Sequence, residues 1–397
     1  MKGRIFMKII NKLHDKLMDI KELRRIERLC HLLEDSSFDP ISNPEMPKEV
    51  KTMAIVIPVL TMSSGGGSSI LRIGTYVASK GVELTYLVQG HKTHEDIKTL
   101  KKNASISIPD YKGTFKLFEE HDDHYDICMA TNWLSVYYCK QLNGYKTYFI
   151  QDFEPFFYDV GDEYMLAKKT YTFGFHHISL GPWNLKQIEN NVQDVHSKSD
   201  YITFPYEPKE YKMVDRDYMS YRTKNKFNMA VYIKESGRRI PAIIQYLLKE
   251  TESKLKEHGI ELNVYYYGLK KDVKVLSGTN LGLLTKKQLF ELYKKVDFGM
   301  VASMTNISLV PYEMLATGLP TFEFKDGSYS AFLGNDTAML IGFDPNELTN
   351  RILEVINNPQ QLIDMNSKAM NQLKELSWEK TCEEFYKIIT SGSKLNG

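Results

Sequence analysis

Short apolar runs alternate with helical patterns over most of the chain after about residue 50. The apolar runs are rich in β-branched and aromatic residues, which is typical of parallel strands buried on both faces. They cover residues 53–59, 82–88, 126–131, 146–150, 227–233, 262–268, 297–302 and 321–324. This alternation predicts an α/β protein built on parallel sheets.

Residues 204–208 (Phe-Pro-Tyr-Glu-Pro) interrupt this pattern with an extended, proline-rich segment. A polar and charged run over residues 209–226 follows, and the strand pattern restarts at residue 227. Such a segment is typical of a domain boundary. A chain of 397 residues is long enough for two domains with full cores, so we expect one domain on each side of residue 208.

Residues 8–33 read as an amphipathic helix in which seven basic residues outnumber four acidic ones. A basic amphipathic helix can lie in an anionic membrane interface. The alternative is a helix that packs on its own domain or on the second copy in a homodimer. Residues 36–48 contain three prolines and read as a linker, so residues 1–47 form an N-terminal arm.

The bulk composition is that of a soluble globular protein, with 42% hydrophobic and 25% charged residues. A net charge of +1 argues against nucleic acid as a partner. No apolar stretch is long enough to span a membrane, and the start lacks the apolar core of a signal peptide. Cys30, Cys128, Cys139 and Cys382 lack metal or redox spacing, which indicates a reducing compartment. We expect a cytoplasmic protein without a metal site.

The stretch 308–321 carries the first candidate for binding chemistry. Pro311 suits the first turn of a helix, Gly318 suits the position just past its end, and Pro320 prevents continuation. This reading puts Glu313 in the first turn, near the positive end of the helix dipole. A carboxylate there can bind ligand hydroxyls at the edge of a parallel sheet. The alternative is a surface glutamate that helps to cap the helix.

Two further features suit a phosphorylated ligand. Gly65, Gly66 and Gly67 lie between the first strand and a helical pattern that starts at Ile70. Backbone N–H groups there can face an anion, because glycine lets a ligand approach the backbone closely. The alternative is an ordinary flexible loop.

Lys234 and Arg239 flank a glycine turn after the strand 227–233, with Arg238 as the reserve candidate. Such cations can stabilise a leaving diphosphate without a metal. The alternative is that they are solvated surface cations.

Polar and aromatic residues follow two strands of the first domain. Trp133 comes after the strand 126–131, and Asp152 and Glu154 come after the strand 146–150. Ligands sit outside the carboxyl ends of parallel strands, so these side chains are candidates for binding acceptor hydroxyls, and Asp152 and Glu154 also for removing a proton. Helix capping and loop hydration are the alternative roles.

The stretch 308–321 resembles the nucleotide-sugar signature of GT-B glycosyltransferases of family 4. The string 148–171, with Gln151-Asp152-Phe153-Glu154-Pro155, is similar to the branch of bacterial rhamnosyltransferases that build surface-layer glycans and rhamnans. The resemblance implies a GT-B fold, in which two Rossmann-like doubly wound domains face a cleft. It also implies metal-independent, retaining transfer of a sugar, most simply rhamnose from dTDP-rhamnose, to a growing glycan or a lipid-linked glycan.

The resemblance also implies roles for single residues. Glu313 would bind the ribose, Lys234 and Arg239 the diphosphate, and Leu283 and Leu284 the base. Thr305 stands where the family usually has a glutamate facing the donor sugar. The full donor set is Gly65, Gly66, Gly67, Lys234, Arg238, Arg239, Gly268, Leu283, Leu284, Thr305, Asn306, Ser308, Tyr312 and Glu313. The catalytic set is Lys234, Arg239, Glu313 and Asp152, and no other base stands out.

In this fold a last helix with a tryptophan near its start returns to the first domain, here from Ser377-Trp378-Glu379. The expected domains are therefore residues 48–208 with 377–397, and residues 209–376. Three rivals remain: a catalytically silent GT-B subunit that binds a partner or glycan, a transferase that uses a UDP- or GDP-sugar, and a nucleotide-dependent oxidoreductase. The oxidoreductase is disfavoured because GxGxxG is missing.

Overall fold

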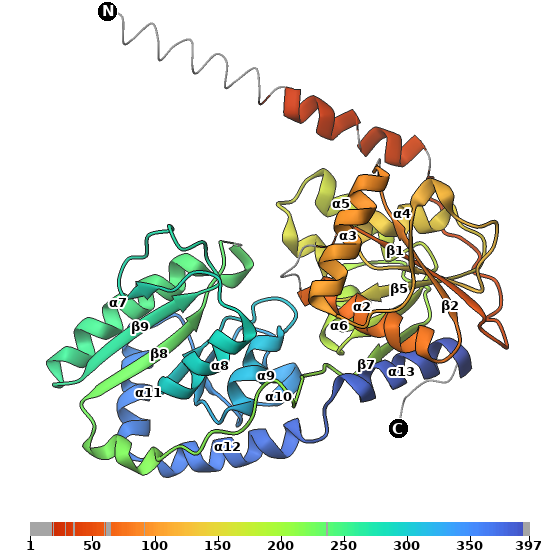
Figure 1. The fold of residues 1–397 in the computed structure, drawn as a ribbon. Helices are drawn as coiled ribbons and strands as arrows, with labels where there is room; N and C mark the ends of the chain where they lie inside the picture. Colours follow the sequence, from red (N-terminus) through yellow and green to blue (C-terminus); the bar gives the residue numbers. More distant parts are fainter. Residues whose placement is uncertain are drawn as a thin grey trace, which may run out of the picture.

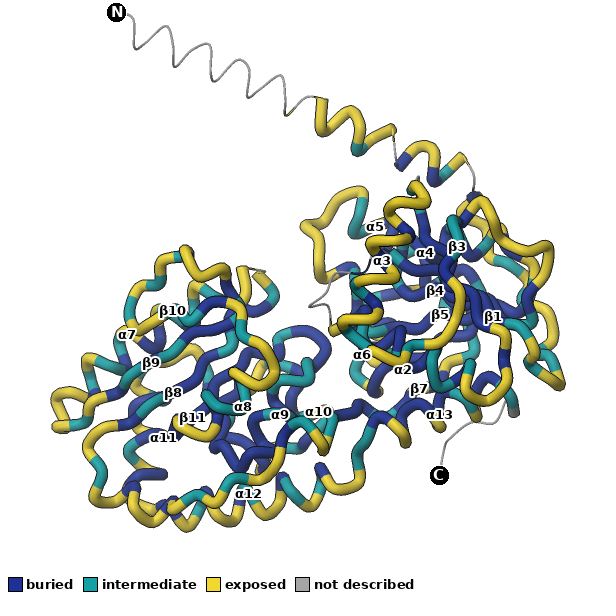
Figure 2. Tube along the Cα trace, in the orientation of Figure 1, coloured by how far each residue is buried: buried dark blue, intermediate teal, exposed yellow. Residues whose placement is uncertain are grey.

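The computed structural model describes residues 18, 20–27, 29–34, 36–58, 60, 65–90, 92–235 and 237–391. Each of two domains has a parallel sheet with helices around it (Figure 1). The buried residues follow the strands and the helix faces against them (Figure 2). The predicted α/β architecture with two doubly wound domains is confirmed.

The first domain holds a seven-stranded sheet in the order β3-β2-β1-β4-β5-β6-β7. Its strands are β1 (Thr52–Ile57), β2 (Glu83–Val88), β3 (Thr114–Leu117), β4 (Ile127–Ala130), β5 (Tyr145–Ile150), β6 (His176–Leu180) and β7 (Ser199–Ile202). Its helices are α2 (Gly65–Ser79), α3 (His94–Ser107), α4 (Trp133–Lys140), α5 (Asp162–Thr170) and α6 (Trp183–Asn191). The strand order reverses beside β1, which pairs with β2 on one side and β4 on the other.

The second domain holds a six-stranded sheet in the order β10-β9-β8-β11-β12-β13. Its strands are β8 (Lys226–Tyr232), β9 (Glu261–Tyr267), β10 (Thr279–Asn280), β11 (Phe298–Met300), β12 (Thr321–Phe324) and β13 (Met339–Ile341). The helices are α7 (Pro241–Glu257), α8 (Lys286–Lys295), α9 (Leu309–Ala316), α10 (Ser330–Leu333), α11 (Pro345–Asn357) and α12 (Gln360–Leu373). Here the order reverses beside β8, which pairs with β9 and β11.

The chain crosses between the domains twice. After β7 it runs through residues 203–217 into the second domain, and after α12 it returns with α13 (Trp378–Ser391), which lies beside α2 and β7 (Figure 1). The Glu384 carboxylate accepts hydrogen bonds from the backbone N–H and the hydroxyl of Thr203, at 2.7 and 2.9 Å. The last helix is therefore fixed to the end of the first domain's own sheet.

The described part of the N-terminal arm is helical over most of residues 18–34. Leu29 and Leu32 are buried in the first domain, and Arg25 pairs with Asp162 at 3.0 Å and with Glu163 at 3.1 Å. The arm's earlier turns expose Met18, Ile20, Leu23 and Ile26. Residues 1–17, which carry part of the predicted helix, lie outside the described residues. None of the described helices is long and apolar enough to cross a bilayer.

Candidate functional site

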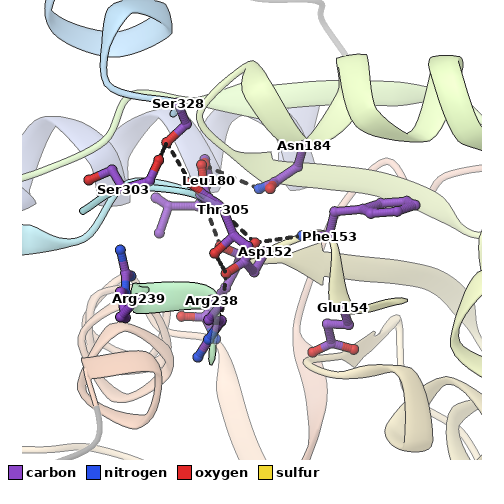
Figure 3. Close-up of polar contacts among 12 residues, drawn as sticks. Asp152, Phe153, Glu154, Leu180, Asn184, Arg238, Arg239, Ser303, Thr305 and Ser328 are labelled. Atoms are coloured by element: carbon purple, nitrogen blue, oxygen red, sulfur yellow. Dashed lines mark hydrogen bonds and ion pairs between the residues drawn. The ribbon is translucent and has the colours of Figure 1, made fainter. Parts of the chain in front are cut away.

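The two domains meet where the loops after β5 and β6 face the loops after β8 and β11. The central residue is Asp152, just past the end of β5 (Figure 3). Its Oδ1 accepts from the N–H groups of Phe153 and Asn306, at 2.9 and 3.0 Å. Its Oδ2 accepts from Arg238 Nη1 at 2.8 Å and from Thr305 Oγ1 at 2.9 Å. Three of these four donors come from the second domain.

Asn306 adds two more hydrogen bonds across the same boundary. Its Nδ2 donates to the carbonyl of Gln151, just past the end of β5, at 2.7 Å and to the carbonyl of Leu180, the last residue of β6, at 3.0 Å. Its Oδ1 is buried and has no hydrogen-bond partner among the described residues. Gly181 has φ +83°, and an added Cβ would lie 2.1 Å from the Phe332 ring of the second domain, so only glycine permits this approach. We call the residues that meet here the interdomain contact: Gln151, Asp152, Leu180, Gly181, Arg238, Thr305, Asn306 and Phe332.

The adjacent arginines Arg238 and Arg239 have different surroundings. The Arg238 guanidinium reaches Asp152 and lies 3.9 Å from the ring centroid of Phe157, so it faces the first domain. Arg239 is buried and donates to the carbonyl of Ala302 at 2.9 Å. The sequence reading paired Lys234 with Arg239, but the structure makes the reserve candidate, Arg238, the arginine that faces the other domain.

Sequence reasoning missed a buried network that supports the loop after β11. Glu323 accepts from the N–H and hydroxyl of Ser303, at 3.0 and 2.6 Å, and burial raises the pKa of Glu323 to about 7. Ser328 Oγ donates to the carbonyls of Ser303 and Thr305 (Figure 3). Glu323 lies within the predicted strand 321–324, and no local signal marks it as part of a site.

Glu313 lies on α9, which begins at Leu309, two residues before Pro311. Glu313 is therefore in the second turn of the helix, and the prediction of the first turn is wrong, because the helix accommodates Pro311 as its third residue. Gly318, with φ +70°, follows the helix end as expected. Burial raises the pKa of Glu313 to about 7, opposed by Lys286, and the Tyr211 hydroxyl lies near the carboxylate.

A row of tyrosines joins Glu313 to Lys234. The exposed Lys234 ammonium lies 5.8 Å from the ring centroid of Tyr232, and that ring lies 5.5 Å from the ring of Tyr267. The hydroxyls of Tyr267 and Tyr293 are 2.7 Å apart; burial raises the pKa of both tyrosines well above its ordinary value, and the nearby charge of Glu313 adds to that shift. Glu313 and Lys234 thus lie near the ends of one row at the carboxyl edge of the sheet.

Five further members of the expected donor set have different surroundings. Leu283 is 68% exposed, whereas Leu284 packs partly on the core. Ser308 Oγ, at the start of α9, is buried and has no hydrogen-bond partner within the part of the chain that the structure describes. Tyr312 is buried and stacks on Phe204 at 5.1 Å, so its ring packs on the connection between the domains. Gly268 has φ +99° and packs against the carbonyl of Ile233.

The glycines Gly65, Gly66 and Gly67 form the first turn of α2, so the expectation of a glycine turn before a helix starting at Ile70 is wrong. The helix begins earlier although glycine is a poor helix former, so the apolar pattern that starts at Ile70 does not mark its first turn. A Cβ on Gly66 would lie 3.3 Å from the Gln151 amide oxygen. The start of α2 therefore lies next to the interdomain contact.

Glu154 and Trp133 contact each other inside the first domain. Glu154 accepts from the backbone N–H of Trp133 and from the Tyr148 hydroxyl at 3.0 Å, and burial raises the pKa of Glu154 to about 8. Trp133 is buried, and its indole N–H donates to the Tyr158 hydroxyl at 2.8 Å. In Figure 3 Glu154 points away from the Asp152 cluster.

Charged residues also connect the domains near the first crossing. Glu210 lies between Arg72 of α2, at 3.8 Å, and Lys286 of α8, at 2.5 Å. Arg72 also pairs with Glu207 at 3.3 Å and lies 5.1 Å from the Trp378 ring centroid. No group of three or more metal-binding side chains occurs among the described residues. His176 instead pairs with Asp200 at 2.8 Å inside the sheet.

The two facing parallel-sheet domains have the GT-B fold, which solved structures share. A sucrose-phosphate synthase from Thermosynechococcus elongatus matches 86% of this chain and all of its own, with a TM-score of 0.61 at 13% identity. A glycosyltransferase from Rickettsia africae matches 87% of this chain and all of its own (TM-score 0.61, 14% identity). Anabaena HepE in complex with UDP and glucose matches 86% of this chain and all of its own (TM-score 0.59, 11% identity).

Among curated proteins, the O-antigen biosynthesis protein RfbC of Myxococcus xanthus is 26% identical over 293 residues. The match covers 68% of this chain and 21% of RfbC, so the chain spans about a fifth of the length of that relative. No family model matches the chain.

Proposed function

We propose that the protein is a GT-B glycosyltransferase that moves a sugar from a nucleotide donor to a growing surface polysaccharide. The observation that carries the proposal is the placement of Glu313 and Lys234 along one row of tyrosines, at the carboxyl edge of the second domain's sheet. A carboxylate suits ribose hydroxyls, and a cation suits a departing diphosphate. The RfbC similarity supports a role in polysaccharide synthesis.

In this proposal the donor lies on the second domain. Glu313 accepts hydrogen bonds from the ribose, and the exposed Leu283 contacts the base together with the backbone at Leu284. Lys234 and Arg238 hold the diphosphate, while the buried Arg239 keeps the loop after β11 in place. The start of α2 offers backbone N–H groups to the donor from the first domain.

The donor sugar is most simply rhamnose from dTDP-rhamnose, which the string 148–171 suggests, transferred with retention and without a metal. The UDP in the structure of HepE makes a UDP-sugar the main alternative, and a GDP-sugar remains a third. With a thymidine donor only the ribose 3′-hydroxyl would reach Glu313. The acceptor, a glycan or lipid-linked glycan, would approach from the first domain, in the cytoplasm or at the inner face of its membrane.

A thermal-shift panel with dTDP, UDP and GDP tests the nucleotide site. A ligand at 100 times its dissociation constant adds about 2.7 kcal/mol to the unfolding free energy. We expect one of the three to raise the melting temperature of the wild type, and a smaller shift for Glu313→Gln. The absence of any shift with all three would contradict the proposal.

A catalytically silent GT-B subunit is the second candidate, and one observation favours it. Asp152, the acid predicted for proton transfer, is engaged by four protein donors. Release of nucleoside diphosphate from dTDP-rhamnose, UDP-glucose or GDP-mannose by the purified protein distinguishes the two. Slow hydrolysis above the buffer rate supports the enzyme, whereas nucleotide binding without any turnover, with or without glycan acceptor, supports the silent subunit.

A further inference from the structure

We propose that Asp152 is a positioning residue that latches the two domains together and thereby orients Arg238. The Asp152 carboxylate has a limited capacity to accept hydrogen bonds. Two oxygens offer about four lone-pair sites, and Asp152 receives two hydrogen bonds on each oxygen. Its hydrogen-bonding capacity is therefore filled by protein donors, and it can bind a substrate hydroxyl or remove a proton only by giving up one of them.

The latch spans the domain boundary. The donors Arg238, Thr305 and Asn306 lie on two separate loops of the second domain, and Asp152 brings both loops to the end of β5. The Asp152 side chain is 10% exposed, so its charge depends on the Arg238 guanidinium for compensation. When one partner of such a pair is removed, the remaining charge is left without its counterion, and exposure to water becomes the favourable alternative.

Arg238 is the group that the latch orients. Asp152 holds one edge of its guanidinium, and the Phe157 ring, also of the first domain, lies against its face at 3.9 Å. The contact with Asp152 uses one of five guanidinium N–H donors, and the side chain is 31% exposed. Donors remain for a ligand anion, and their direction is fixed by the first domain. Separation of the domains would release Arg238 from both contacts.

Glu154 provides a matched control. It is a carboxylate two residues after Asp152 and on the same loop, but its partners Trp133 and Tyr148 belong to the first domain. A change at Glu154 perturbs the same loop without touching the hydrogen bonds between the domains. Any effect of Asp152→Asn that Glu154→Gln also produces is therefore a local effect.

Small-angle X-ray scattering of the full chain, without nucleotide, tests the latch directly. Asp152→Asn places an N–H₂ group against Arg238 and Thr305, so we expect a larger radius of gyration than in the wild type. Glu154→Gln should scatter as the wild type does. Thr305→Val removes one of the four donors to Asp152, so it should increase the radius of gyration by a smaller amount. This variant replaces Asp152→Asn in the test if Asp152→Asn does not fold. Unchanged scattering in folded Asp152→Asn, or in folded Thr305→Val where that variant replaces it, overturns the proposal.

Nucleotide binding tests the second half of the proposal and rests on the proposed function. With UDP or dTDP as the probe, calorimetry should give a dissociation constant about tenfold higher for Asp152→Asn, because a smaller fraction of molecules is competent to bind. Arg238→Gln should raise it similarly, and the double variant no further, since both changes remove one coupled unit. Additive effects would refute coupling through Arg238. If the wild type binds neither probe, the proposed function fails while the scattering result still decides the latch.

Discussion

The two acidic regions of the molecule, around Asp152 in the first domain and around Glu313 in the second, differ in how their acceptor capacity is used. Four protein donors fill the lone pairs of Asp152, and one of them carries a full positive charge. Glu313 has the Tyr211 hydroxyl nearby and a pKa raised by burial to about 7. A buried carboxylate without full compensation is poorly solvated, and a ligand with hydroxyl groups relieves that cost.

The comparison teaches that an acid at the edge of a parallel sheet is not a ligand-binding residue by position alone. Both acids follow the pattern that places ligands at strand ends. What separates them is whether the other domain supplies the donors. Substitutions at four positions test this distinction.

Lys234→Ala should give the largest loss of activity. Lys234 is exposed beside Tyr232, so its removal leaves the core intact, and in the proposed function it takes away a cation that faces the leaving diphosphate. We expect sugar transfer or donor hydrolysis to fall by about 10²–10³. Lys270→Ala, at another exposed lysine of the second domain, is the control and should be neutral. Equal rates in Lys234→Ala and the wild type would remove Lys234 from the site.

Glu313→Gln should weaken nucleotide binding by about 10–100-fold, since a hydrogen bond to a charged group contributes about 1.5–3 kcal/mol. The same residue predicts a pH dependence. Only the ionised carboxylate accepts fully from ribose hydroxyls, so wild-type affinity should fall as the pH drops through about 7. The Gln variant should show a flat profile in calorimetric titrations. A pH profile shared by both would assign the titration to another group.

Glu154→Gln should change the pH dependence of stability. The folded pKa of Glu154, about 8, lies above its ordinary value of 4.5, so the folded state binds more protons than the unfolded state between these values. The contribution of Glu154 to stability therefore falls as the pH rises through that window. The variant should gain roughly 2 kcal/mol relative to the wild type between about pH 5 and pH 9, because the side chain is only half-buried. Urea denaturation at the two pH values measures this difference, and a constant difference would contradict the assignment.

Leu283→Ser should have the smallest effect. Leu283 is 68% exposed, so the unfolding free energy should change by less than about 0.5 kcal/mol. If Leu283 contacts the base, the dissociation constant of the preferred nucleotide should rise about 3–5-fold, which is the loss of part of one apolar contact. Ile363→Ser, at an exposed apolar side chain of α12, is the control for general surface effects. Equal affinities in both variants would place Leu283 outside the site.

The apolar runs alone predict the central strands of both sheets. The runs at 53–59, 227–233 and 262–268 became β1, β8 and β9, because buried parallel strands have a continuous apolar signature. The strands β3, β6, β7, β10 and β13 were not predicted, because runs of two to five residues carry too little apolar pattern of their own. Helix starts were also misplaced at Gly65 and Leu309, where glycine and proline obscured the first turn.

The pairing of Asp152 with Arg238 across the domain boundary follows from the tertiary structure alone. Asp152 and Thr305 are 153 positions apart, and Arg238 and Asp152 are 86 apart, so no local pattern records that they share hydrogen bonds. Residue type places a charge at a strand end. Its partners depend on how the second domain meets the first, because hydrogen bonds act over about 3 Å in space and not along the chain.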